Sequence, residues 1–282
     1  MKRCFGVVVH SEFLCGKVKK SFAGPVTKLF LPHDVTALGT SLTRQQLGLA
    51  ADRIVILTVG HVNPNKQVES VIRALGNNQD LRGRIHYVLA GPIEPKYREQ
   101  LMSRAKRSGI EKDLMFVGQV SDEILHAYFR HADFCINLRY PAFESASGSL
   151  VEGLLHGKAI IVSDIGFFAE IPDDCVLKIK PQGDEQELGQ AIRTLATNTS
   201  ARNQLQEKAI AFAAQHFYPR RYAEEFLQFL EQARRAKPVL QAVDYVSGEL
   251  GRMGVTPEMP IAGQAASIIP ELFLKNTDNS KG

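Results

Sequence analysis

The stretch RIVILTVGHVNPNK, residues 53–66, decides the fold expected of this chain. Its first half is a continuous apolar run rich in β-branched residues, which is typical of a strand buried on both faces of a parallel sheet. The run ends at Gly60, where Asn63, Pro64 and Asn65 predict a tight turn. A helical pattern follows near residues 67–75, so we interpret the stretch as strand, loop and helix.

The same alternation continues along the chain. Further apolar runs are IHYVLAG (85–91), LMFVG (114–118), DFCINL (133–138), KAIIVSD (158–164) and VLKIK (176–180). Helical patterns near 96–107, 122–131 and 149–156 lie between them. Strands that alternate with helices in this way form parallel sheets joined by crossover connections. We therefore predict an α/β protein with a Rossmann-like parallel sheet over residues 53–217.

A shorter strand–helix–strand block precedes this domain. It consists of CFGVVV (4–9), a helix near 12–20 and VTKLFLP (26–32). Two strands cannot bury a sheet on both faces, so we expect residues 1–32 to be the truncated remnant of another Rossmann domain. Residues 33–52 mix turn formers with a short helical piece and are predicted to be a linker.

Residues 218–275 are predicted to be C-terminal helices, followed by a disordered tail over residues 276–282. The apolar residues Tyr222, Phe226, Phe229, Leu230 and Ala233 fall on one stripe of a helix. Such a stripe requires a packing partner, so we expect self-association or a partner subunit.

Composition excludes several classes of protein. The 282 residues are 44% hydrophobic, which suffices for a sizeable core, and a net charge of +4 does not favour nucleic-acid binding. Four cysteines without a C-x-x-C pair predict buried free thiols. No apolar stretch approaches the roughly 18 residues that span a bilayer, and the start lacks signal-peptide features. We expect a cytoplasmic protein and leave open a peripheral location at the membrane.

Lys66 is the first candidate site residue. It is predicted to lie at the start of a helix, where the helix dipole disfavours a cation unless an anion is bound. Lys66 is therefore a candidate phosphate ligand. The alternative is an ordinary solvated lysine on the surface.

The stretch RYPAFESASGSLVEGLLHGK, residues 139–158, carries the second candidate site. We predict that its helix begins near Gly148, which places Glu144 in the loop at the carboxyl edge of the sheet and Glu152 one turn into the helix. The first amides of the helix, 148–150, would then point at an anion. An anion site flanked by two carboxylates suits a ligand with phosphate and hydroxyl groups, such as a sugar nucleotide. The alternative is a pair of surface acids.

Other chemistries lack their motifs. The histidines show no spacing such as H-E-x-x-H, and no G-x-S-x-G accompanies them. We therefore expect neither a metal site nor a serine hydrolase.

In order, GHVNPNK, VLAGP, MFVGQV and ESASGSLVEGLLHGKAIIVSD resemble the donor half of family-four retaining glycosyltransferases of the GT-B fold. The resemblance implies two Rossmann-like domains, with the acceptor bound by the first and a nucleotide sugar by the second. Residues 53–217 would be the donor domain and residues 1–32 a remnant of the acceptor domain, most of which is absent. The last helix of such enzymes crosses back onto the first domain.

The resemblance also implies residue roles. Lys66 and Glu144 are the implied catalytic residues, with Lys66 on the diphosphate and Glu144 facing the hydroxyls of the transferred sugar. Glu152 would bind the ribose, and backbone at 118–120 would meet the base. The implied donor-binding residues are Gly60, His61, Lys66, Gly91, Gly118, Gln119, Val120, Ser147, Gly148, Ser149, Leu150 and Glu152. The family usually has an arginine where this chain has His61, which implies weaker or pH-dependent binding of the diphosphate.

The implied function is transfer of a sugar from a UDP- or GDP-linked donor to an unknown acceptor, a glycan, lipid or protein, with retention of configuration. No metal or other cofactor is implied, and the implied process is cell-surface polysaccharide biosynthesis. Because most of the acceptor domain is absent, we expect the chain to be incomplete as a catalyst by itself, with a separate acceptor-domain subunit as a possible partner. The alternative is a non-catalytic subunit that binds a nucleotide sugar or a partner protein.

Overall fold

The computed structural model describes residues 4–33, 41–182 and 185–274. The chain divides into two compact units, one of residues Phe30–Tyr222 and one of Met1–Leu29 with Ala223–Gly282. Each unit is described by itself. The predicted tail, 276–282, lies outside the described residues.

The larger unit contains a six-stranded sheet with the strand order β5-β4-β3-β6-β7-β8, and every neighbouring pair is parallel. Its strands are β3 (Ile54–Val59), β4 (Ile85–Ala90), β5 (Leu114–Gly118), β6 (Phe134–Asn137), β7 (Ala159–Ser163) and β8 (Leu177–Ile179). Each coincides with one of the apolar runs in the sequence. The predicted α/β class with a parallel sheet is confirmed.

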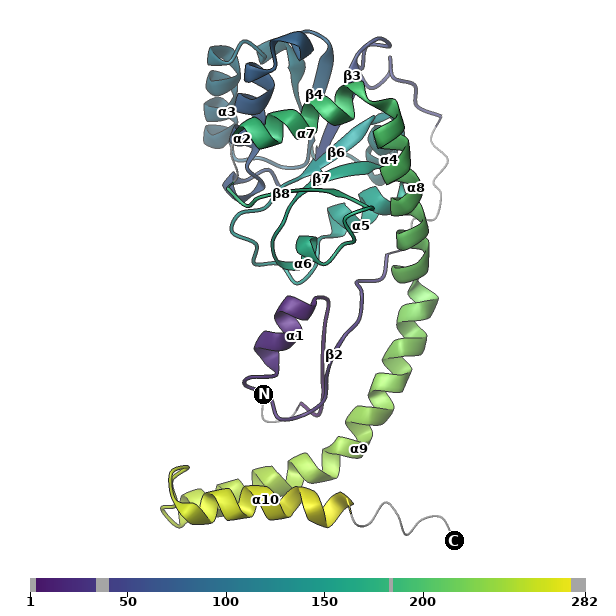
Figure 1. The fold of residues 1–282 in the computed structure, drawn as a ribbon. Helices are drawn as coiled ribbons and strands as arrows, with labels where there is room; N and C mark the ends of the chain where they lie inside the picture. The colour runs from purple at the N-terminus through teal and green to yellow at the C-terminus, as the bar shows by residue number, and fades with distance from the viewer. Residues whose placement is uncertain (1–3, 34–40, 183–184, 275–282) are drawn as a thin grey trace. The chain divides into compact units, whose positions relative to one another are not determined.

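Helices cover both faces of this sheet (Figure 1). They are α2 (Val68–Asn77), α3 (Pro95–Arg107), α4 (Asp122–His131), α5 (Gly148–Leu155), α6 (Gly166–Ala169), α7 (Glu185–Thr197) and α8 (Thr199–His216), with short 3-10 turns η1 (Pro64–Lys66), η2 (Gln79–Leu81) and η3 (Glu111–Asp113). Because successive residues of a strand point to opposite faces, Ile56 joins the core under α2, α3 and α7, whereas Leu57 joins the core under α4, α5 and α8.

The strand order places a topological switch between β3 and β6. From β3 the chain proceeds outward through β4 to β5, then returns to β6 on the other side of β3 and proceeds outward to β8. The connections after β3 and β6 therefore leave the sheet in opposite directions, which opens a crevice at the carboxyl ends of these two strands. Ligands of doubly wound sheets bind in this crevice.

The segment before β3 packs on the larger unit. Leu47 and Leu49 are buried in its core. Arg44 donates hydrogen bonds to the His131 carbonyl at 3.1 Å and to Asp133 at 3.3 Å. The predicted linker, 33–52, thus contributes apolar side chains to this unit over the part that the structure describes.

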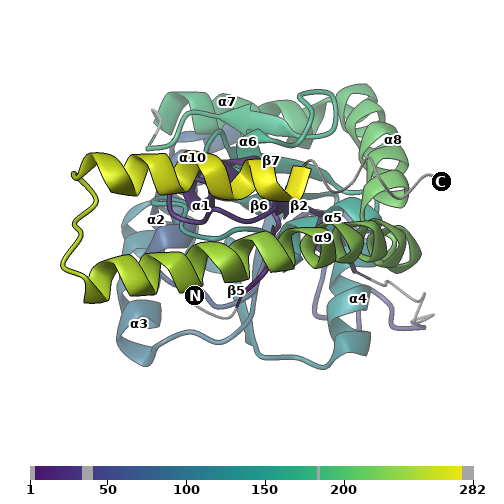
Figure 2. The same cartoon turned by 90° about the horizontal axis from the view of Figure 1, so that it is seen from below.

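The smaller unit begins with two parallel strands, β1 (Val7–Val9) and β2 (Val26–Lys28), joined by α1 (Glu12–Val18). The long helix α9 (Pro219–Arg252) enters this unit at Ala223, and α10 (Pro260–Leu274) folds back beside the second half of α9 (Figure 2). In the predicted stripe, Phe229 is buried and its ring closely approaches Gly6. Leu230, on the same stripe, is 44% exposed.

The cysteines are free thiols, as predicted, and Cys15, Cys135 and Cys175 are buried. Among the helices of the described residues, none has the length and apolar character that crossing a membrane requires. The predicted domain boundaries at residues 32, 52 and 217 remain predictions.

Candidate functional site

The loops that follow β3 and β6 meet at the switch point. The amide of Tyr140, after β6, donates a hydrogen bond to the carbonyl of Asn65, after β3, at 2.8 Å. Lys66 ends the turn η1, two residues before α2, and its Nζ reaches back to donate to the Val59 carbonyl at 2.6 Å. The Lys66 side chain is only 5% exposed. The alternative interpretation of Lys66 as a solvated surface lysine is therefore wrong.

Arg139 brings a second cation to this place. It follows β6 closely, and its side chain is 7% exposed. Its Nε donates to Glu144 Oε1 at 2.9 Å, and its guanidinium lies over the ring of Phe168. The Arg139 amide donates to Ser163 Oγ at the end of β7, which fixes the backbone. Glu144 itself lies in the loop before α5, as predicted, with its side chain one third exposed.

The electrostatics of these three residues are coupled. Burial and the positive charge of Arg139 lower the pKa of Lys66 to about 7, while Glu144 acts in the opposite direction. Burial also lowers the pKa of Arg139, again opposed by Glu144. Two buried cations thus share one carboxylate, which leaves an environment that favours an anion.

Arg139 is absent from the residues that the sequence predicted. The available signal was its position, because a basic residue directly after a buried strand lies at the carboxyl edge of the sheet. The sequence does not show that its side chain turns inward, since that depends on Glu144 and Phe168.

Three predicted glycines lie together at the carboxyl ends of β3, β4 and β5. The Gly91 amide donates to the Gly118 carbonyl at 2.8 Å, and a Cβ on Gly91 would lie 2.3 Å from the carbonyl oxygen of Gly60. All three have positive φ, at 93° for Gly60, 149° for Gly91 and 68° for Gly118. Only glycine permits this close approach of neighbouring strand ends. Gln119 and His61, next in sequence, are exposed, and Val120 is partly buried.

The amino end of α5 forms a cluster of hydroxyl groups. Helix α5 begins at Gly148, and Ser147 caps it by accepting a hydrogen bond from the Leu150 amide at 3.3 Å. Asn137, the last residue of β6, donates to Ser149 Oγ at 3.1 Å. The Leu150 amide is therefore engaged within the helix end, which corrects the expectation that it is free for a phosphate. The amides of Gly148 and Ser149 remain candidates for that role.

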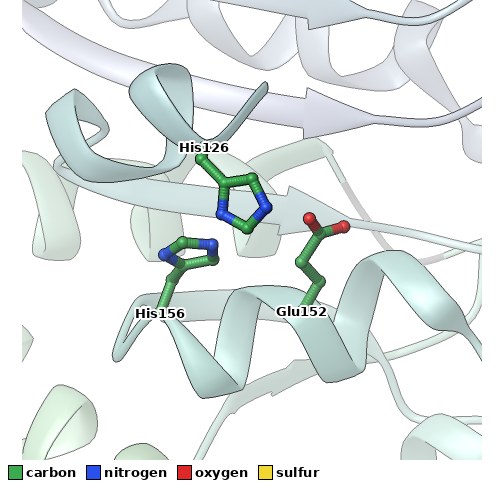
Figure 3. Close-up of side chains that lie close together, drawn as sticks. All are labelled: His126, Glu152 and His156. Carbon is green, nitrogen blue, oxygen red and sulfur yellow. The ribbon is translucent and has the colours of Figure 1, made fainter. Parts of the chain in front are cut away.

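Glu152 lies further along α5 and is half-buried. Burial raises its pKa to about 7, and the nearby carboxylate of Asp122 adds to this effect. Among the described interactions, Glu152 is grouped with His126 and His156 rather than with Lys66 or Glu144 (Figure 3). The structure thus places Lys66, Arg139 and Glu144 close enough to interact electrostatically, and it gives Glu152 separate surroundings.

A parallel sheet covered on both faces, with buried cations at its switch point, defines the class as a doubly wound α/β domain with a candidate anion site. Residues 40–212, more than half of the chain, match the family of glycosyl transferases group 1. The chain belongs to this family, and it corresponds mostly to the C-terminal domain.

Two relatives match this chain over less than half of their own length. Lipopolysaccharide 1,2-N-acetylglucosaminetransferase of Salmonella typhimurium is 27% identical over 176 residues, which are 59% of this chain and 45% of that protein. D-inositol 3-phosphate glycosyltransferase of Geodermatophilus obscurus is 29% identical over 178 residues, 59% of this chain and 37% of that protein. The chain therefore spans less than half the length of these two relatives.

A solved structure of Anabaena HepE in complex with UDP and glucose has the same fold. Its TM-score is 0.67 at 21% identity, and the match covers 79% of this chain and 62% of that chain. The predicted fold class, a Rossmann-like parallel sheet of GT-B type, is confirmed by such neighbours.

Proposed function

We propose that this chain carries the donor half of a retaining glycosyltransferase, which transfers a sugar from a UDP- or GDP-linked donor to an acceptor. The observation that carries the proposal is the burial of Lys66 and Arg139 together at the switch point, with Glu144 as their shared carboxylate. A diphosphate would supply the negative charge that these two cations lack. The complex of HepE with UDP and glucose supports this choice of ligand.

In the proposed reaction, the two cations stabilise the leaving group. Negative charge develops on the diphosphate as its bond to the sugar C1 breaks, and Lys66 and Arg139 would face that charge in a buried setting. The amides of Gly148 and Ser149 at the amino end of α5 would add further hydrogen bonds. Because protein cations neutralise the diphosphate, the proposed mechanism uses no metal ion.

The configuration at the sugar C1 is retained if the acceptor attacks on the face from which the diphosphate leaves. The acceptor oxygen forms the new bond to C1, the electrons of the broken bond pass to the diphosphate, and a phosphate oxygen takes the acceptor proton. Glu144, held by Arg139, would accept hydrogen bonds from the sugar hydroxyls. Ionised Glu152 would bind the ribose, and backbone at 118–120 would face the base.

Calorimetric titration with UDP, GDP and UDP-glucose tests the donor site. We expect the parent chain to bind a nucleotide, and Lys66→Ala and Glu152→Ala to weaken binding by about 10- to 100-fold, the usual cost of a charge-assisted hydrogen bond. Matched controls are Lys96→Ala and Glu99→Ala, two exposed residues of α3. A parent chain that binds none of these ligands, or a Lys66 variant that binds like the Lys96 variant, would contradict the proposal.

Catalysis is measured separately, as UDP release from a UDP-sugar in the presence of candidate acceptors. We expect negligible release by this chain alone and release after an acceptor domain is supplied in trans. Efficient release by the chain alone would show that it is complete as a catalyst.

A further inference from the structure

His126, Glu152 and His156 form a cluster beside the proposed donor site, here called the histidine cluster. His126 comes from α4, and the other two residues come from α5. Each residue offers one ligand atom, and these three atoms lie within 4.8 Å of one another. In Figure 3 the ring of His156 turns a nitrogen toward His126 and the Glu152 carboxylate. The three groups therefore converge on one small volume.

Local structure holds the cluster in this form. Glu152 and His156 are four residues apart, so they lie on the same face of α5. The His156 ring stacks on Phe129, with 4.8 Å between centroids and 7° between planes, which fixes its orientation. The His126 ring packs against the His156 ring at 4.9 Å. These contacts fix the imidazole of His156 before any ligand binds.

One buried polar atom of the cluster lacks a partner among the described residues. His156 Nε2 is buried and has no hydrogen-bond partner among the residues that the structure describes. Within the same residues, no hydrogen bond joins any two members of the cluster. A buried nitrogen without a partner is unusual, because it has lost water and gained no replacement. A ligand bound at this place would give the nitrogen a partner.

The donor set of the cluster suits a cation that accepts nitrogen ligands, because two imidazoles and one carboxylate converge from α4 and α5. The ammonium group of Lys158 is engaged by backbone, since its Nζ donates to the carbonyls of Arg130 at 3.3 Å and Ala132 at 2.9 Å.

We propose that the histidine cluster binds a zinc ion, with two imidazole nitrogens and the Glu152 carboxylate as its three protein ligands. Two nitrogen donors with one carboxylate suit Zn²⁺, whereas Mg²⁺ and Ca²⁺ prefer an all-oxygen shell. Three protein ligands leave the fourth tetrahedral position to water. The site lies outside the proposed reaction, which uses no metal.

A second consequence rests on the proposed function. Glu152 is the residue proposed to bind the ribose, and one carboxylate cannot serve both the ribose and a zinc ion in the same geometry. Zinc would therefore act as an antagonist of the nucleotide sugar. Its binding site would overlap the donor site through Glu152 alone.

Metal binding is tested on the full chain with Zn²⁺ by calorimetry and with Co²⁺ by visible absorption. We expect about one equivalent to bind, with tetrahedral d–d bands and without the charge-transfer band that a cysteine thiolate would add. His126→Gln and His156→Gln should each weaken binding by at least about tenfold, since even outer-shell changes cost that much. The matched control is His131→Gln, which changes another histidine of α4.

Circular dichroism checks that the variants fold, and His126→Gln carries the test if the His156 variant does not fold. Absence of zinc binding by the parent chain, equal binding by the His126 and His131 variants, or a thiolate band would each overturn the proposed site.

The antagonism has its own readout, the affinity for UDP with and without Zn²⁺. We expect zinc to weaken UDP binding more in the parent chain than in His126→Gln, where only the chelation of zinc by UDP in solution remains. Equal weakening in both would overturn the antagonism. Failure of the metal-free parent to bind any nucleotide would contradict the proposed function and leave the zinc titration to decide the metal site.

Discussion

At Lys66, burial and the charge of Arg139 act in the same direction on the ammonium group. Burial removes water from the charged form, and the guanidinium repels it, so the amine loses its proton near pH 7 instead of near the ordinary lysine value of 10.5. The Val59 carbonyl, which accepts a hydrogen bond from Nζ, retains its donor in either protonation state. A bound anion would raise the pKa of Lys66 again, so that the amine regains its proton.

This lowered pKa predicts how stability depends on pH. Between about pH 7 and the ordinary lysine value of 10.5, the unfolded chain holds a proton on Lys66 that the folded chain has lost. The free energy of unfolding should therefore rise with pH, by at most about 1.4 kcal/mol per unit. Urea unfolding between pH 7 and pH 9 measures this slope. Lys66→Met should reduce this slope, leaving the contribution of the buried Lys158, and the exposed-residue variant Lys96→Met should not reduce it.

The measurement stops at pH 9 because, above that pH, the titration of other groups lowers the free energy of unfolding. Burial raises the pKa of the Cys135 thiol to about 12, so beyond pH 9 the unfolded chain loses that proton first and stability falls. Equal slopes for the parent chain and Lys66→Met would show that Lys66 keeps its proton in the folded chain.

Among the elements, helix α5 combines a structural and a binding role at its amino end. Ser147 caps the helix and also lies 3.4 Å from Asn137 Nδ2, so one hydroxyl joins the helix start to the end of β6. Ser121 caps α4 in the same way, by accepting from the Ile124 amide, and among the described hydrogen bonds its hydroxyl has no partner in the loops after β3 and β6. Comparing variants of the two serines therefore distinguishes the effect of losing a helix cap from the effect of disturbing the site.

Replacing either serine by alanine should lower the free energy of unfolding by about 1 kcal/mol, the usual cost of a lost cap. Only Ser147→Ala should also weaken UDP binding, because it releases Asn137 and the first turn of α5. Chemical denaturation and calorimetry of the two variants measure these effects. A Ser121 variant that loses as much UDP affinity as the Ser147 variant would refute a specific role for Ser147.

The elements themselves could be predicted from the sequence, whereas several contacts could not. Strands such as 54–59 are buried on both faces, so their apolar runs are continuous and visible. Glu144 and Lys66 follow from loop positions at strand ends. Arg139 was missed because inward burial of an arginine depends on partners from the tertiary fold. His126 was missed as a partner of Glu152 because they lie on different helices.

At the scale of the whole molecule, apolar side chains are exposed on α9, on α10 and in the turn that joins them. Tyr245 and Met253 are 70% and 77% exposed, and Ile261 and Ile268 are 50% and 54% exposed. In a solution of this chain alone, a second copy is the only protein that could cover them. The match covers only 45% and 37% of the two relatives, and the same surface in a longer protein would have other partners available.

We therefore expect the purified chain to self-associate as its concentration rises. Light scattering measures the weight-average mass, which should exceed that of the 31.2 kDa monomer. Changing Tyr245 and Met253 to serine should shift the mass toward the monomer, whereas the control Tyr218→Ser, which removes an exposed ring before α9, should not. A monomeric parent chain at high concentration would contradict this prediction.

The hydrogen bond from Tyr140 to Asn65 has a mechanical consequence. It ties together two loops that leave the sheet on opposite sides of the switch point, one ending in Lys66 and the other beginning near Arg139. The separation of the two cations is then set by backbone rather than by the rotamers of two long side chains. Displacement of one loop would therefore move the other loop with it, and Lys66 and Arg139 would shift together.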